Sequence, residues 1–507
     1  MNVIVILCDT LRRDHCGPYH HGRPLNECWS TEAPPWVVPT PNMDRLATRG
    51  TVFDQAYCGS HPCMPARRDL YTGRYDFLER GWAPLEEEDL DLPRQVSGPP
   101  NRSLRRVVDE GYRISYLVTD HFHLWEQGSG NYHMGYSGFE FIRGAESDAW
   151  HTDPLDGFPC PPRDRLAKNE RHWRNVHHIR RSEEDWFCAQ IFRQASDWLE
   201  HNHRYDDFYL HLDCFDPHEP WDPPAELVAQ FDPDAYDVEG WTAAAPYARW
   251  QGVMTEEQFR SARARYAAKV VLVDRWLGRL LDTMDRLDLW QDTLVVFTTD
   301  HGTYNGDHGR MGKMQTHLHD ASAHIPFIIA HPTLSHGERR QQLVQLVDIY
   351  PTVLAAVGRP IPPDRHGVNL LPALADPASP TRQYALSGVF GKSVSLTDGR
   401  WVLHQSPVLE NQPLHWHSPY LAKFSHYDLG PYQDGYRLAQ TPSWPEPTWL
   451  SDTLADPNEL QNLTKSQPEV LGRMQQALST KLAEVGAPAE QRTRLGLDGV
   501  NWASPQV

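Results

Sequence analysis

The chain has 507 residues, of which 40% are hydrophobic and 11% aromatic, so it carries enough apolar side chains for a large core and is not an intrinsically disordered protein. Its formal net charge of −19 argues against nucleic acid or an anionic membrane surface as the main partner. The length exceeds that of one ordinary domain of roughly 100 to 200 residues and favours a large domain with a smaller companion.

Short apolar segments rich in β-branched residues alternate with helical segments along most of the chain. The predicted strands are 3–7, 114–118, 208–212, 294–298 and 325–330. The predicted helices are 43–49, 104–110, 183–200, 256–287 and 343–357. This alternation is typical of an α/β fold with a large, mostly parallel sheet flanked by helices.

The sequence changes in character near residue 375. The stretch ADPASP at 375–380 predicts a linker, and the segment that follows it predicts a β-hairpin with a turn at Asp398 and Gly399. We therefore divide the chain into a first domain, 1–375, and a smaller C-terminal α+β domain, 376–507.

The first ten residues, MNVIVILCDT, predict a buried strand rather than an export signal, and no segment approaches the roughly 18 apolar residues of a membrane span. We therefore expect a cytoplasmic protein. The eight cysteines form no CxxC pair, which excludes a zinc ribbon and a small disulfide scaffold. We expect most of them to be reduced, buried thiols.

Polar side chains follow four of the predicted strands. They are Asp9, Asp120 with His121, 213–218, and Asp300 with His301. In an open α/β sheet, ligands bind in the crevice beyond the carboxyl ends of the strands. Each residue alone is also compatible with a helix cap or a loop carboxylate, but four polar strand ends together favour a functional site.

The segment CMPARRDLYTGR, residues 63–74, resembles the signature of the sulfatase family, in which C-x-P-x-R is followed by T-G-R. The resemblance implies an alkaline phosphatase-like catalytic domain in which Cys63 is oxidised to formylglycine. One hydroxyl of the hydrated aldehyde attacks the bound ester, and loss of a proton from the other later expels the sulfate. Arg67 would orient this hydrate and offset its negative charge. The alternative is an unmodified Cys63 that caps a helix.

The segment VVFTTDHGTYNGDHGRMGK, 295–313, resembles the family's metal-binding segment. The resemblance implies that Asp300 and His301 join Asp9 and the modified Cys63 around one divalent metal ion, Ca²⁺ or Mn²⁺. Lys313 would hold the terminal oxygens of the sulfuryl or phosphoryl group.

The segment LDCFDPHEPWDPP, 212–224, carries His218 where the family places a histidine that contacts the ester and protonates the leaving oxygen. The chain departs from many sulfatases in having Cys8 before Asp9 instead of a second Asp, and Thr119 where a Lys is common. His121 would take the place of a further family histidine, with His123 nearby. These departures resemble the branch of phosphonate monoester hydrolases and phosphodiesterases.

The resemblance therefore predicts a metal-dependent hydrolase of sulfate esters, with a phosphonate monoester or phosphodiester hydrolase as the alternative and a non-catalytic binding protein as a remote one. It implies a small anionic ester as substrate and a formylglycine-generating maturation enzyme as partner, and it leaves a homo-oligomer open. No nucleic acid and no membrane partner is expected. Little of the stretch 126–181, which is rich in Trp, His and Arg, resembles the family, and we predict that this stretch shapes substrate access.

Overall fold

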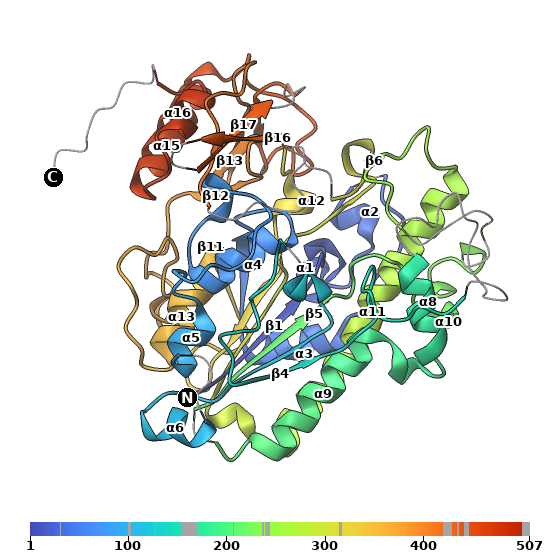
Figure 1. Cartoon of the computed structure of the whole chain (residues 1–507). Coiled ribbons are helices and arrows are strands. Elements are labelled where there is room, and N and C mark those ends of the chain that lie inside the picture. Colours follow the sequence, from blue (N-terminus) through green and yellow to red (C-terminus); the bar gives the residue numbers. More distant parts are fainter. Residues whose placement is uncertain are drawn as a thin grey trace.

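The computed structural model shows a large sheet enclosed by helices, with a smaller antiparallel sheet packed at one end (Figure 1). It describes residues 1–30, 32–99, 103–126, 128–154, 170–205, 207–235, 238, 244–313, 317–418, 428–432, 435–440 and 446–498. Cys160 and most of the centre of the 126–181 stretch lie outside these residues. Among the described helices, none combines the length and the apolar character needed to cross a bilayer.

The large sheet has eight strands in the order β11-β2-β10-β7-β1-β5-β3-β4. Their bounds are β1 Asn2–Cys8, β2 Thr51–Tyr57, β3 Ser115–Thr119, β4 Gly138–Phe141, β5 Tyr209–Cys214, β7 Thr293–Thr298, β10 Phe327–Ala330 and β11 Glu338–Gln345. Only β10 runs antiparallel to its neighbours, β2 and β7, within this sheet. All five predicted strands lie in the sheet, and the prediction that it is mostly parallel is confirmed.

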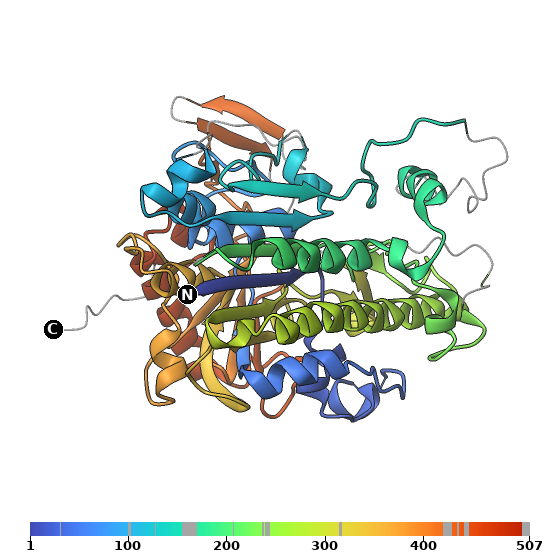
Figure 2. The ribbon, with the colours of Figure 1, turned by 90° about the horizontal axis from the view of Figure 1, so that it is seen from below.

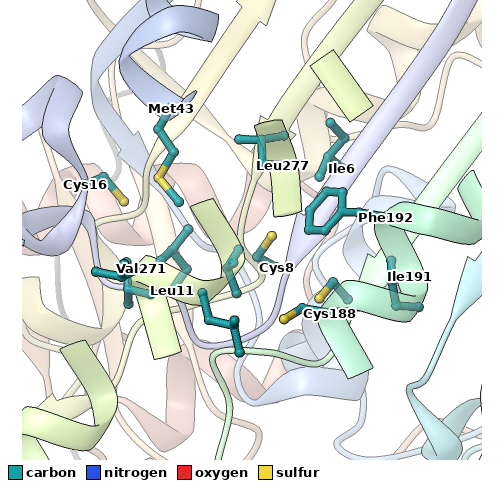
Figure 3. Packing of buried hydrophobic residues seen from close by; sticks show 14 of the residues in the cluster. Ile6, Cys8, Leu11, Cys16, Met43, Cys188, Ile191, Phe192, Val271 and Leu277 are labelled. Atoms are coloured by element: carbon teal, nitrogen blue, oxygen red, sulfur yellow. The ribbon is translucent and has the colours of Figure 1, made fainter. Parts of the chain in front are cut away.

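Alternate side chains of β1 point into two separate cores, as the two-residue period of a strand requires. Ile4, Ile6 and Cys8 pack under α3 (Pro41–Arg49), α9 (Phe187–Asn202) and α11 (Glu256–Arg286). Figure 3 shows Ile6 and Cys8 among Met43, Phe192 and Leu277 of these helices. Figure 2 shows α9 and α11 running side by side along the sheet.

The other face of β1, formed by Val3, Val5 and Leu7, packs under α4 (Cys63–Thr72), α5 (Leu92–Ser97) and α13 (Ile349–Ala356). Because both faces are covered, every residue of the strand from Val3 to Cys8 is fully buried. This explains why the segment is a continuous apolar run instead of an alternating one.

The predicted helix 343–357 is wrong in its first part. Residues 343–345 are the end of β11, where Leu343 pairs with Gln55 and Gln345 with Tyr57 of β2. A 3-10 turn, Leu346–Asp348, follows and is capped by Gln345 and Asp348, and α13 begins only at Ile349. The backbone groups of 343–345 are therefore bonded to β2, which sequence periodicity does not reveal.

The predicted helix 183–200 is also divided, into a 3-10 turn at Glu183–Asp185 and α9, which extends to Asn202. The predicted helix 104–110 is α6, Leu104–Asp109. The remaining elements are short helices and strands. They are α1 Gly17–His20, α2 Leu25–Cys28, α8 Glu170–Ile179, α10 Ala225–Val228, α12 Asp320–Ala323, α14 Leu371–Ala375, α16 Glu490–Arg494, β6 Ala248–Arg249, β8 Tyr304–Asn305, β9 Arg310–Gly312, β15 His415–Trp416, β16 Asp428–Tyr432 and β17 Gly435–Gln440.

The smaller sheet is antiparallel, in the order β12-β13-β14-β18. Its strands are β12 Ala385–Gly388, β13 Val394–Thr397, β14 Trp401–Gln405 and β18 Trp449–Asp452, and α15 (Pro468–Glu484) packs against it. The hairpin predicted at Asp398 and Gly399 joins β13 to β14 and is confirmed. The division at residue 375 stays a prediction.

Candidate active site

Three strands deliver carboxylates to the same edge of the large sheet. Leu7 of β1 pairs with Asp213 of β5 and also with Thr298 of β7, so these strands end at the same level. Asp9 follows directly after β1, and Asp300 lies two residues beyond the end of β7. All three carboxylates, Asp9, Asp213 and Asp300, are fully buried. The expected convergence of polar strand ends is therefore present.

Cys63 is the first residue of α4, and its side chain is buried among the strand-end residues. Its Sγ lies 3.7 Å from Asp9 Oδ1, 3.4 Å from His301 Nε2 and 3.5 Å from Lys313 Nζ. The amino end of a helix carries a partial positive charge, which favours an anion bound there. The position of Cys63 therefore suits a group that attacks an anionic ester.

Arg67 lies one turn further along α4 and holds the carboxylates in place. Its Nε and Nη2 donate to the two oxygens of Asp213 at 2.8 and 2.6 Å. Its Nη1 lies 2.9 Å from Oδ2 of both Asp9 and Asp300. The four residues are completely buried. The single guanidinium thus fixes three carboxylates from three different strands.

Asp9, Cys63, Asp300 and His301 offer ligand atoms that all lie within 4.8 Å of one another. His301 donates from Nδ1 to the carbonyl of Gly302 at 2.7 Å, which leaves Nε2 facing Cys63 and 3.3 Å from Asp300 Oδ2. Such a bond to the remote ring nitrogen is the usual support of a metal-bound histidine. The residues predicted to bind the metal are therefore brought together.

The electrostatics of the four residues fit a bound cation. Burial and the neighbouring charge of Asp9 raise the pKa of Asp300. Although burial alone would raise it, Arg67 and His218 hold the pKa of Asp9 well below its usual range. One guanidinium thus serves several crowded carboxylates, and a divalent ion would relieve their repulsion. The oxygen and imidazole donors suit such an ion.

Lys313 and His218 approach Cys63 from the other side. Lys313 follows β9, and its Nζ contacts His218 Nε2 and lies 3.7 Å from Glu219 Oε1. Burial alone would lower the pKa of Lys313, but the groups around it, chiefly Cys63 and Glu219, raise it, so the ammonium stays charged. His218 Nδ1 contacts the carbonyl of Glu219, which leaves Nε2 directed at Lys313. This pair can deliver a positive charge and a proton to the position above Cys63.

His121 and Thr119, predicted after β3, are placed differently. His121 Nε2 lies 3.3 Å from Asp9 Oδ2, so this residue joins the site. Burial and the charge of Arg67 lower the pKa of His121 to about 3, which keeps its imidazole neutral. The hydroxyl of Thr119 accepts a hydrogen bond from the backbone N–H of His121 at 3.0 Å, and this bond shapes the turn after β3. The catalytic role of Thr119 stays a prediction.

Three residues that were not predicted individually also belong to this region. Asp213 binds Arg67, and its place at a strand end was the signal that could have identified it. His61, two residues before the signature cysteine, packs against His301 with the two rings tilted and their centroids 4.4 Å apart. Glu146 lies in the stretch 126–181. Burial alone would raise its pKa, but the contact with His123 lowers the pKa to about 2. Lys313 and His218 also lower this pKa, so the stretch reaches the site.

The comparisons with known proteins agree with this geometry. A family model described as Sulfatase matches residues 1–359. Arylsulfatase K of Homo sapiens is 26% identical over 470 residues, a match that covers 87% of this chain and 77% of the relative. Two solved structures share the fold. A phosphonate monoester hydrolase from Silicibacter pomeroyi has a TM-score of 0.64 at 19% identity and covers 95% of each chain. A protein in complex with its substrate D-glucosamine-2-N,6-O-disulfate has a TM-score of 0.63 at 15% identity and covers 99% of each chain.

Proposed function

Because the chain belongs to the sulfatase family, we propose that it is a metal-dependent hydrolase that cleaves sulfate esters at a formylglycine derived from Cys63. One observation carries this proposal. The residues of the signature, of the metal-binding segment and of the His218 loop, which are far apart in the sequence, meet around Cys63 within contact distance.

The environment of Cys63 supports its conversion to formylglycine. Burial and the nearby negative charge of Asp9 raise the pKa of its thiol well above the usual range, so an unmodified cysteine would stay protonated. A neutral thiol is a weak nucleophile and a weak metal ligand. The hydrated aldehyde would instead offer one hydroxyl for attack on sulfur and a second whose deprotonation releases the sulfate.

Asp9, Asp300 and His301 would hold the divalent ion, with residue 63 as the fourth ligand, and we propose Ca²⁺ or Mn²⁺. When bound, such an ion acidifies a nucleophilic hydroxyl and polarises the ester. Arg67 keeps the two carboxylates fixed through its contacts with both of them and with Asp213. The protein thereby fixes the direction of attack before the substrate binds.

Lys313 and His218 act on the substrate itself. The ammonium of Lys313 would neutralise a terminal oxygen of the sulfuryl group, where negative charge gathers in the transition state. In its imidazolium form, His218 would give the proton on Nε2, the nitrogen that contacts Lys313 here, to the departing alcohol oxygen and become a neutral imidazole. Both side chains are largely buried, which strengthens these interactions because little water competes.

A second candidate is the hydrolysis of phosphonate monoesters or phosphodiesters at the same residues. The charge of the site favours it beside sulfate esters. The three carboxylates Asp9, Asp213 and Asp300 would together balance Arg67 and the proposed divalent ion. Burial chiefly lowers the pKa of His61 and of His121, so Lys313 is the remaining side-chain cation next to Cys63 in the described part of the chain. Sulfate esters, phosphonate monoesters and phosphodiesters each carry one negative charge, whereas a phosphate monoester carries nearly two. We therefore expect the site to disfavour phosphate monoesters.

The proposal is tested by mass spectrometry of the peptide that contains residue 63 and by turnover of aryl sulfate. We expect formylglycine at this position, and we expect Cys63→Ala to abolish turnover. Cys58→Ala is the matched control. Cys58 is also buried and lies five residues earlier, but its Sγ faces the carbonyl of Ser322 instead of the predicted metal ligands. Wild-type turnover in Cys63→Ala, or an unmodified cysteine in fully active protein, would refute the proposal.

Matched aryl sulfate, phenylphosphonate monoester and phosphodiester substrates then decide between the two candidates, because the one with the highest kcat/KM identifies the preferred ester. The maturation enzyme, the homo-oligomer and the cytoplasmic location stay predictions.

A further inference from the structure

We propose that the chain holds a second metal site, for a transition-metal ion such as Zn²⁺, formed by His319, His404 and Glu459. The three residues come from different segments: the residue before α12, strand β14 and the loop after β18. None of them is among the ligands of the catalytic site. Their ligand atoms all lie within 4.8 Å of one another.

The carboxylate of Glu459 lies between the two imidazoles. Its Oε2 is 2.7 Å from His404 Nε2 and 3.5 Å from His319 Nδ1. The side chains are almost completely withdrawn from solvent, with exposed fractions of 4% for His319, 0% for His404 and 1% for Glu459. Two nitrogens and one oxygen thus face a common point, and small shifts would place them about 2.0 to 2.2 Å from a zinc ion.

The atoms that would not bind the metal are already engaged. The backbone N–H of Asp320 donates to Glu459 Oε1 at 2.7 Å, which leaves Oε2 directed at the histidines. His404 Nδ1 lies 2.7 Å from Ser395 Oγ and can donate its N–H there, which leaves the Nε2 lone pair for the ion. Bonds of this kind orient the ligands in protein metal sites and fix the histidine tautomer.

His319 supplies the observation that a hydrogen-bonded structural cluster does not explain. Its Nδ1 is buried, and its contact with Glu459 Oε2 at 3.5 Å does not meet the geometry of a good hydrogen bond. The neighbouring His317 is a contrast, because its two ring nitrogens each lie 2.9 Å from an oxygen, Ser393 Oγ and the carbonyl of Pro447. A buried polar atom without a well-formed hydrogen bond destabilises the folded protein, and a metal bond would remove this cost.

An ion could reach the site and complete its coordination from a neighbouring cavity. A cavity of about 1030 Å³ is lined in part by His308, His319 and Asn458, the last of which precedes Glu459. His308 stacks on His319 with ring centroids 3.9 Å apart. Zinc is commonly four-coordinate, with three protein ligands and a water molecule in the fourth position. Here the fourth position would open to this cavity.

Such an ion would connect the two sheets. His404 belongs to the smaller antiparallel sheet. In the sequence, His319 comes after Lys313 of the active site and before strand β10 of the large sheet. Binding would therefore fix His319 and the start of α12 against β14. We expect the bound ion to stabilise the folded protein and not to take part in ester cleavage.

The test uses the full chain, freed of metal and then equilibrated with Zn²⁺, with the bound zinc measured by elemental analysis. We expect Glu459→Gln and His404→Gln to bind one equivalent less than the wild type, through a loss of affinity at that site of at least about 100-fold. His317→Gln is the control, since it alters a neighbouring histidine whose nitrogens are already bonded, and it should retain the full zinc content.

Anomalous diffraction from wild-type crystals at the zinc edge supplies a measurement that needs no variant. A peak between His319 and His404 would support the site even if both variants fail to fold. Absence of that peak in zinc-soaked crystals, or an unchanged zinc content in folded Glu459→Gln, would overturn the proposal. Neither readout depends on activity, so failure of this second site leaves the proposed hydrolase untouched.

Discussion

Asp213→Asn tests the inference that one buried guanidinium organises the active site. The substitution keeps the shape of the side chain but removes its charge and one of its two acceptor oxygens. Arg67 currently donates to both oxygens at 2.8 and 2.6 Å, in a fully buried environment. In the variant, one guanidinium N–H would face an amide NH₂ group, which also donates.

The magnitude follows from these contacts. A hydrogen bond between charged groups contributes about 1.5 to 3 kcal/mol, and breaking a buried ion pair costs about 3 to 5 kcal/mol. Asp9 and Asp300 still balance the charge of Arg67 at 2.9 Å, so we take the lower part of this range. We expect the free energy of unfolding to fall by about 3 kcal/mol. We also expect kcat/KM to fall about 100-fold, because Arg67 would no longer fix the carboxylates.

The assay combines urea unfolding with the kinetics of aryl sulfate hydrolysis. Asp120→Asn is the matched control, since Asp120 is also a buried carboxylate at the end of a neighbouring strand. Burial and the charge of Asp216 raise the pKa of Asp120 well above its usual range. Its Oδ1 accepts from the backbone N–H of Phe215 at 2.8 Å, which an amide oxygen can also do, so we expect a change below about 1 kcal/mol. If the two variants lose the same stability and activity, the reasoning about Arg67 is refuted.

Three further predictions concern charge and metal. Lys313→Met should lower kcat by about 100- to 1000-fold, because the cation that faces the developing negative charge is lost. Lys313→Arg keeps a cation there and should retain part of the activity. Equal rates of the two variants in steady-state assays would contradict this. Removal of metal by a chelator should suppress turnover, and Ca²⁺ or Mn²⁺ should restore it; full activity of a preparation shown by elemental analysis to be metal-free would disprove the metal requirement. Burial alone would raise the pKa of Glu490, but hydrogen bonds with His417 and His415 lower it to about 2. The ionised carboxylate should therefore stabilise the folded protein above its ordinary pKa of 4.5. This contribution should be lost as the pH falls towards 2. Because solvent screens this partly exposed group, Glu490→Gln should lose about 1 kcal/mol less than the wild type between pH 6 and pH 3. Parallel losses in chemical denaturation would show that the carboxylate is not responsible.

The local patterns in the sequence identified several of the strands that carry the chemistry. The apolar run before Asp9 predicted β1 because a strand covered on both faces needs apolar side chains throughout. The signature identified Cys63 and Arg67 by resemblance, but α4, which carries both of them on one face, was not among the predicted helices. The motifs around Asp300 and His218 indicated the remaining groups.

The tertiary structure decided which distant residues meet. The pairing of Leu7 with both Asp213 and Thr298 sets three strand ends level, and only this register turns Asp213 into the partner of Arg67. The meeting of His404 with Glu459 likewise depends on how the smaller sheet packs. Periodicity encodes which face of an element is buried, but strand order and register arise from contacts between segments that are remote in the sequence, and no local pattern specifies them.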